Sequence, residues 1–335
     1  MTIAAAPRNP YGPAPLRRPG SIRRTSSIDV SWPDGDRGPM CLQGHARDLV
    51  TPSDGSPPRF GAEDRIEVAA TPIREILALS ACPPRPALAG LVGRRAGSHF
   101  RAAIDEILPE ERDCASPLYL LLDDLAGTSL VAAWAWSLWR DDWLDRLRED
   151  GRHKTGGRGG RMEGVCIGFA PGSSALAANG FLQPKQNGVA VPPLEHPEDP
   201  EGWHPLPAQT GVGMRRARRI DAWVDGGTIY IDAGFQDSAT APGGRRVAIH
   251  EYALSATADF GAGVLLTLSA DPRVLPHSEC PGAIANIGRL VGTSLAGLRK
   301  TVLEELRGTA GCTHLNDALR ALAEVPQLIA RLPAR

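Results

Sequence analysis

Alternation of apolar and polar residues predicts two groups of strands, one in each half of the chain. The segments have period two and are rich in β-branched residues, as is typical of strands with one face buried. The turn residues Pro-Asp-Gly at 33–35 and Asp-Gly-Gly at 225–227 indicate hairpins. The expected strands are Ser27–Trp32, Met40–Asp48 and Ile66–Ala70, and later Arg219–Val224, Thr228–Phe235, Val247–Ala256 and Val264–Ala270.

Helical periodicity follows each group of strands. In the C-terminal half it predicts helices over about Pro281–Leu290, Ser294–Leu306 and Thr313–Ala323. Because strands precede helices instead of alternating with them, we expect an α+β fold with antiparallel sheets. The apolar stretch Leu118–Trp139 is interrupted by Asp123, Asp124 and Gly127, and we expect no membrane span.

The two halves resemble each other, which indicates an internal duplication. Cys82 and Cys280 each precede a proline and a helical pattern that ends in Leu-Val-Gly, and Cys114 and Cys312 each follow 32 residues later. Upstream blocks also match in order, with Asp48 opposite Asp237. The matched blocks are Arg23–Trp32 with Arg215–Val224, Cys41–Thr51 with Tyr230–Thr240, and Ile66–Pro72 with Leu266–Pro272.

We therefore expect two tandem α+β repeats, each an antiparallel sheet followed by two or three helices, with a helical and loop insertion between them. The predicted parts are a disordered N-terminus (1–20), a first, degenerate repeat (21–126) that lacks about one strand, an insertion (127–211) and a second repeat (212–330). The insertion should begin as a helix over Val131–Glu149, whose four tryptophans pack on the sheets or form a lid. Its Gly156–Arg161 segment lacks the spacing of a phosphate-binding loop.

Composition excludes several classes of protein. The 335 residues carry 37 Lys and Arg against 38 Asp and Glu, so no global positive field favours nucleic acid or an anionic membrane. Aromatic residues make up 5%, which leaves few stacking platforms for single strands. Six cysteines are too few for a disulfide framework, and the proline-rich N-terminus has no signal-peptide core. We expect a cytoplasmic monomer or homodimer.

Chemistry used once should differ between the two halves, and the surroundings of the second cysteine do differ. Gly311-Cys312-Thr313-His314-Leu315-Asn316-Asp317 contrasts with Asp113-Cys114-Ala115-Ser116-Pro117-Leu118-Tyr119. A cysteine at a helix start faces free N–H groups and the positive end of the helix dipole, which favour thiolate. His314 and Asp317 are three apart and share a helix face, so Asp317 could fix the imidazole tautomer.

Three interpretations of this constellation stay open. Cys280, Cys312 and His314, with Asp317 nearby, could bind zinc or iron. Alternatively, Cys312 is a nucleophile with His314 as its base and Asp317 as the orienting acid. In the third interpretation the cysteines only pack, and Thr313 and Asp317 satisfy backbone donors at the helix start.

Other polar positions give weaker signals. His250 lies on a strand that the first repeat lacks, and we expect a strand-surface histidine, with a role in the site as the alternative. Asp237 has its counterpart in Asp48 and is expected to be a turn or cap residue. The run Arg215, Arg216, Arg218 and Arg219 is interpreted as a solvated guard of a sheet edge.

The segment SECPGAIANIGRLVG, followed by LRGTAGCTHLNDALRAL, resembles a bacterial family known as domain of unknown function 2889. The resemblance rests on the Cys-Pro helix start, Leu-Val-Gly and Gly-Cys-Thr-His-Leu, and RRTSSIDVSWPDG is similar to the family's N-terminal strand. It implies a setting in the catabolism of steroids and aromatic acids. A remoter likeness to scaffold proteins of iron–sulfur cluster assembly concerns only the cysteines at two helix starts.

These observations lead to two alternative functions. The first is a catabolic enzyme acting on a hydrophobic carboxylic acid or its thioester, with Cys312, His314 and Asp317 as catalytic residues and the tryptophans over an apolar substrate. The second is a non-catalytic metal-binding, ligand-binding or accessory protein.

Overall fold

All strands join into one antiparallel sheet in the computed structural model, which describes residues 6–143, 145–146, 162–177 and 188–333. The strands of the described residues follow the order β4-β3-β2-β1-β6-β7-β8, and β9 and β5 both pair with β8. Their bounds are β1 Ser21–Ser31, β2 Met40–Thr51, β3 Arg59–Ala70, β4 Ile76–Cys82, β5 Val189–Ala190, β6 Gly213–Asp225, β7 Thr228–Thr240, β8 Arg246–Asp259 and β9 Leu265–Val274.

The α+β class is confirmed, but the prediction of a separate sheet in each repeat is wrong. β1 pairs with β6 along its whole length, from Ser21 opposite Trp223 to Ser31 opposite Gly213. The alternating pattern shows which face of a strand is buried and leaves its neighbour open, so it could not reveal this central pairing. The hairpin predicted at 225–227 is confirmed, with Gly226 and Gly227 at φ 55° and 80°.

The N-terminal half has four strands, so the expectation that it lacks one is also wrong. β4 was missed because it is short and mostly exposed at the sheet edge. β4 and β9 occupy corresponding positions: Gly93 N donates to Ile76 O, and Gly292 N donates to Leu265 O, both at 2.8 Å. The block match of Ile66–Pro72 with Leu266–Pro272 therefore paired β3 with β9, one strand out of step.

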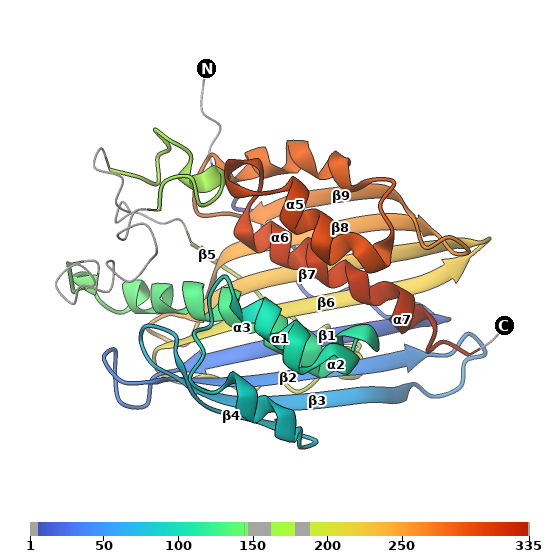
Figure 1. The fold of residues 1–335 in the computed structure, drawn as a ribbon, viewed down its shortest axis with the longest axis horizontal. Coiled ribbons are helices and arrows are strands. Elements are labelled where there is room, and N and C mark those ends of the chain that lie inside the picture. Colours follow the sequence, from blue (N-terminus) through green and yellow to red (C-terminus); the bar gives the residue numbers. More distant parts are fainter. Residues whose placement is uncertain (1–5, 144, 147–161, 178–187, 334–335) are drawn as a thin grey trace.

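Helices cover one face of the sheet (Figure 1). α3 packs on β1, β2 and β3, whereas α6 packs on β8 and α7 contacts β1 and β6. The helices are η1 Pro86–Leu91, α1 Phe100–Ile107, α2 Pro109–Asp113, α3 Pro117–Val131, η2 Ala132–Leu138, η4 Ile167–Phe169, η5 Pro200–Gly202, η6 Cys280–Leu290, η7 Leu295–Gly297, α5 Leu298–Glu305, η8 Gly308–Ala310, α6 Thr313–Ala321, η9 Leu322–Glu324 and α7 Val325–Ile329.

The N-terminal segment packs on the protein from residue 7 onward, which corrects the expectation of disorder over 1–20. Asn9 N donates to Arg273 O and Ala14 N to Leu194 O, both at 2.8 Å. Arg17 forms an ion pair with Asp199 at 2.6 Å. The segment packs because Ala14 and Trp203 form a small apolar cluster with Ala217 of β6. Residues 1–5 lie outside the described part of the chain.

The arginine run is buried at the centre of the sheet, so its interpretation as an edge guard is wrong. β6 lies between β1 and β7 and is covered on both faces, and each arginine compensates for its burial by pairing with a carboxylate. The pairs are Arg215 with Asp29, Arg216 with Asp237 and Asp317, Arg218 with Asp124, and Arg219 with Asp221 and Asp232.

α3 and η2 form a continuous helical segment, Pro117–Leu138, that includes Asp123, Asp124 and Gly127. Its length and mean hydropathy of 1.3 are sufficient for a membrane span despite its two aspartates, although 78% of the most apolar window is buried inside the protein. A core helix tolerates Asp123 and Asp124 because each of these aspartates forms an ion pair with a buried arginine. The helix also crosses the expected domain boundary at 126–127, and Gly156–Arg161 lies outside the described residues.

Candidate functional site

A pocket of about 230 Å³ lies where the start of α6, the strand β8 and the segment 162–169 meet. Its walls are largely apolar and include Trp134 and Trp143 of the insertion. The polar part of the lining consists of two hydroxyl side chains, three thiols and three imidazoles, from Ser137, Thr313, Cys166, Cys280, Cys312, His250, His277 and His314.

Cys312 is the residue before the first turn of α6 and is 2% exposed. Tyr252 of β8 donates its hydroxyl to the sulfur at 3.4 Å, and the N–H groups of His314 and Leu315 also stabilise it. Burial nevertheless raises the pKa of the Cys312 thiol, and these donors offset the rise only in part. A thiol in this state is a poor nucleophile at neutral pH.

Cys280 begins η6 and lines the same pocket as Cys312, so the two helix starts do approach one point. Cys166 belongs to the insertion and lies beside Cys280: a Cβ on Gly168 would stand 2.8 Å from the Cys280 sulfur and 3.8 Å from the Cys166 sulfur. Burial raises the pKa of both thiols, that of Cys166 to about 12. All three pocket cysteines are therefore protonated at neutral pH.

Asp317 does not reach His314 in the expected way. Arginines engage both of its carboxylate oxygens: Arg216 at 2.8 Å, Arg320 at 2.8 Å and Arg101 at 3.1 Å. Burial disfavours its charge, but Arg320, Arg101 and Arg216 together keep the pKa of Asp317 well below its usual range. Asp317 thus joins the buried ion-pair network between β6 and α6, and the carboxylate facing His314 comes from another strand.

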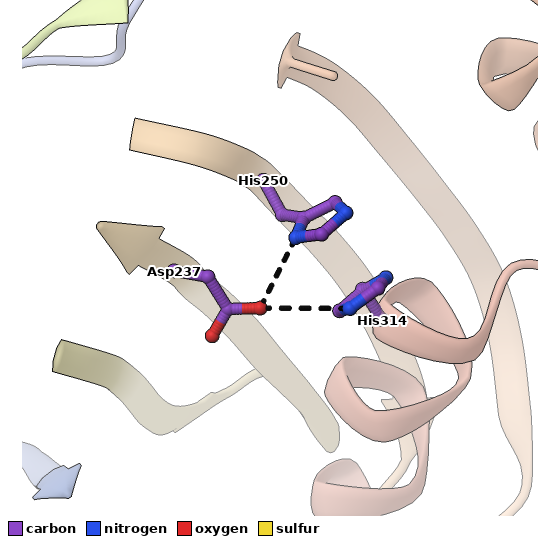
Figure 2. A group of neighbouring side chains, drawn as sticks. All are labelled: Asp237, His250 and His314. Carbon is purple, nitrogen blue, oxygen red and sulfur yellow. Dashed lines mark ion pairs between the residues drawn. The ribbon is translucent and has the colours of Figure 1, made fainter. Parts of the chain in front are cut away.

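That carboxylate belongs to Asp237 of β7. Figure 2 shows the imidazoles of His250 and His314 converging on its Oδ2 atom. His250 Nδ1 lies 3.2 Å from Oδ2, and His314 Nε2 lies 3.7 Å from it. The two rings are stacked, with centroids 3.4 Å apart. Asp237 is fully buried, His250 is 5% exposed, and the ligand atoms of all three residues lie within 4.8 Å of one another.

In this group the carboxyl group of Asp237 is ionised, whereas the imidazoles of His250 and His314 are uncharged. Burial disfavours the Asp237 carboxylate, but attraction to Arg216 outweighs it and holds the pKa of Asp237 well below its usual range. Burial lowers the pKa of His250, and burial together with His250 lowers that of His314 further. The site at neutral pH thus holds one carboxylate and two uncharged imidazoles, the protonation states in which these side chains bind metal.

The structure corrects the expectations for His250 and Asp237, and its geometry gives no support to the expected metal site at Cys280, Cys312 and His314. His250 is buried, not a surface residue, and Asp237 lies inside β7 at an irregularity of the β7–β8 pairing, not in a turn or cap. Asp237, His250 and His314 are the one group of potential metal ligands among the described residues whose atoms all lie this close, and it contains neither Cys280 nor Cys312.

Sequence reasoning also missed Cys166 and His277 as pocket residues. Burial lowers the pKa of His277 to about 4, and its ring contacts Phe169. Cys166 lies in an irregular stretch where no periodicity indicates its direction. His277 had a usable signal: it precedes Cys280 by three residues, in a segment that the first half of the chain lacks.

The fold and pocket together define an α+β protein with an apolar pocket that is lined in part by thiols and imidazoles. Residues 214–327 match the family model described as "Protein of unknown function (DUF2889)", so this part of the chain carries a domain similar to that family. The match extends from β6 to α7 and contains Asp237, His250, Cys280 and the start of α6. Neither the curated proteins nor the solved structures include a match to the chain.

Proposed function

We propose that the protein is a catabolic enzyme that acts on a small hydrophobic carboxylic acid or its thioester in this pocket. The observation that carries the proposal is an apolar cavity whose wall presents two uncharged imidazoles, the buried ring of His250 and the partly buried ring of His314. Pockets that combine apolar walls with a few convergent polar groups of shifted pKa are characteristic of active sites.

The size of the cavity narrows the substrate class. Its 230 Å³ lies below the range of about 300–1,000 Å³ common for drug-sized ligands. A single aromatic ring or a short acyl chain therefore fits better than a fused steroid nucleus. The apolar part of such a substrate would pack against Trp134, Trp143 and Phe169, and its carboxyl or thioester group would face the imidazoles.

The residue roles follow from the geometry of the site. His314 and His250 stand at the reacting end of the pocket. Cys312, buried as a thiol under the hydroxyl of Tyr252, positions His314: its sulfur lies 4.0 Å from His314 Nδ1. Asp317 acts at greater distance, because it fixes Arg216, which in turn holds Asp237.

The experiment is a panel of short aliphatic and aromatic acyl thioesters, with release of free thiol as the readout. We expect hydrolysis that falls by at least about 100-fold in His314→Ala, in the range of a lost acid–base or electrostatic contribution. His204→Asn is the matched control, since His204 is also a buried histidine but contacts Thr25 and Ser27 on the other face of the sheet. Activity that is unchanged in folded His314→Ala contradicts the proposal.

A non-catalytic ligand-binding protein is the second candidate, favoured by the protonated state of all three pocket thiols. The tryptophans of the pocket discriminate between the two. If an aromatic acid changes the tryptophan fluorescence at saturation while none of the thioesters is cleaved, the protein is a binder. The cytoplasm, without nucleic acid or membrane partners, is the setting proposed for either function.

We also propose that the two halves arose by duplication of a common ancestor. The strand order reads the same from either edge to the centre, β4-β3-β2-β1 and β9-β8-β7-β6. Arg24 holds Asp48 across β1 and β2 as Arg216 holds Asp237 across β6 and β7. The likeness to iron–sulfur scaffolds has less support, since no cysteine belongs to a compact ligand group in the described part of the chain.

A further inference from the structure

Two corresponding carboxylates in the sheet differ in what neutralises them. Asp48 accepts two hydrogen bonds from Arg24, at 2.6 and 2.8 Å, and a second cation, Arg331, pairs with its Oδ2. Asp237 accepts the same two bonds from Arg216, at 2.8 and 3.0 Å. Where Asp48 has its second arginine, Asp237 Oδ2 faces the two imidazoles (Figure 2).

The imidazole of His250 lacks a satisfactory hydrogen bond at this point. Its Nδ1 is buried and, although 3.2 Å from Asp237 Oδ2, is not aligned to form a hydrogen bond with any described residue. An unsatisfied buried polar atom costs about 1–3 kcal/mol, so a native site needs a reason to keep one. Binding of a cation beside Asp237 Oδ2 would be such a reason, because Nδ1 lies only 3.2 Å from that oxygen.

The two ring nitrogens of His314 have different neighbours. Its Nδ1 lies 3.3 Å from Thr313 Oγ1 and 4.0 Å from the Cys312 sulfur, and both atoms can accept a hydrogen bond from that nitrogen. In the tautomer with the proton on Nδ1, Nε2 is a hydrogen-bond acceptor and lies 3.7 Å from Asp237 Oδ2. Two acceptors then face each other, and a cation between them removes the repulsion.

The distances agree with a shared metal ion. Nitrogen and oxygen ligands lie about 2.0–2.2 Å from zinc, so neighbouring ligand atoms stand about 3.0–3.5 Å apart around one ion. The observed separations of 3.2 and 3.7 Å from Asp237 Oδ2 are close to this range. The ligand atoms of all three residues lie within 4.8 Å of one another.

We propose that Asp237, His250 and His314 bind a divalent first-row transition-metal ion, of the zinc or ferrous type. Two imidazoles and one carboxylate form the ligand set of catalytic sites that keep coordination positions open. A metal ion held by these residues would be accessible from the pocket, because both imidazoles line it. Arg216 and Thr313 orient the ligands from behind, as the outer partners of metal sites do.

In this assignment Asp237 and His250 take the place of the thiolates of Cys280 and Cys312 that the sequence suggested as ligands. Metal binding is independent of the proposed function, and only the catalytic consequence of the metal rests on it. A metal ion in this position would polarise the carbonyl oxygen of a bound acid or thioester. Metal binding itself is measured without substrate, so failure of one proposal is distinguishable from failure of the other. A protein that binds metal but cleaves no thioester loses only the proposed reaction.

The experiment is titration of chelator-treated, folded full-length protein with Co²⁺, followed by visible absorption and elemental analysis. We expect one ion per chain, with d–d bands and no thiolate-to-cobalt charge-transfer band. His250→Ala, His314→Ala and Asp237→Asn should each weaken Co²⁺ binding by more than about 100-fold. His204→Asn, Cys280→Ser and Cys312→Ser should retain it.

Three outcomes overturn the proposal. One is the absence of stoichiometric binding of Co²⁺ and Zn²⁺ by the folded wild-type protein. Another is a charge-transfer band that disappears in Cys312→Ser, which would assign the ion to the thiols. The third is undiminished binding in folded His250→Ala or His314→Ala. If the alanine variants fail to fold, His250→Gln and His314→Asn replace them, and the wild-type spectrum by itself distinguishes thiolate from imidazole ligands.

Discussion

Arg216 and Asp237 stand directly opposite each other on β6 and β7 and form a buried pair of parallel hydrogen bonds at 2.8 and 3.0 Å. The pair joins the centre of the sheet to the candidate site, since Arg216 also holds Asp317 of α6 and Asp237 faces His250 and His314. One guanidinium therefore fixes the position of α6 relative to the strands that supply the other site residues.

Removing this arginine should destabilise the protein strongly. In Arg216→Met, Asp237 loses its buried partner and Asp317 loses one of its arginines, and breaking a buried pair from one side costs about 3–5 kcal/mol. Urea unfolding measures the change in the free energy of unfolding. The control is Arg65→Met, because Arg65 is largely exposed in its pair with Glu63, and such changes stay within about 0.5 kcal/mol. Equal effects of the two substitutions would contradict the role of Arg216.

Buried histidines should make the protein lose stability in mild acid. Burial holds the pKa of His204 well below 6.5, its ordinary value, so the unfolded chain binds a proton that the folded protein does not. Stability is complete above pH 6.5 and falls as the pH drops below it, by up to about 1.4 kcal/mol per pH unit for each such residue.

The measurement is the free energy of unfolding in urea between pH 7.5 and 5, with chelator present. His204→Asn keeps a side chain that can hydrogen-bond to Thr25 or Ser27 but cannot titrate. Its slope against pH should be smaller by about that amount than the slope of the wild type. If the slopes coincide, His204 is protonated in the folded protein and the predicted linkage is absent.

The cysteines should separate into two classes by reactivity. Cys82 and Cys114 are exposed and should react with an aromatic disulfide reagent within the first phase at pH 7. Cys166, Cys280 and Cys312 are buried with raised pKa values and should react only on unfolding. Peptide mapping after brief iodoacetamide treatment identifies the sites. Fast alkylation of Cys312 in the folded protein would restore the interpretation of this residue as a nucleophile.

Local patterns in the sequence predicted the elements of the fold and left their assembly open. The alternation over Thr228–Phe235 and the helical pattern over Thr313–Ala323 correspond to β7 and α6, because both depend on neighbours in sequence. The pairing of β1 with β6 joins residues about 190 positions apart, and no local pattern encodes it. The buried arginines of β6 were misjudged for the same reason: their carboxylate partners come from other strands and helices.

The candidate site was predictable in part. Comparing the two halves directed attention to Cys312 and His314, and the structure places both in a pocket. The carboxylate was assigned to Asp317 because it shares a helix face with His314, whereas tertiary packing brings Asp237 there from β7. Its match with Asp48 suggested a shared structural role, and that inference missed how differently the two carboxylates are neutralised.

Gly168 should be required for the pocket to keep its shape. A methyl group there would stand 2.8 Å from the Cys280 sulfur, closer than packed atoms approach, so Gly168→Ala must displace η6 or the segment that carries Cys166. Such overpacking costs about 1–3 kcal/mol. Gly288→Ala is the matched control, since a Cβ at that position meets nothing within 4 Å. Unfolding in urea and the fluorescence of the pocket tryptophans with an aromatic acid should both change in Gly168→Ala and stay near wild type in Gly288→Ala. Wild-type behaviour of Gly168→Ala in both measurements would mean that the insertion does not close tightly over the cysteines.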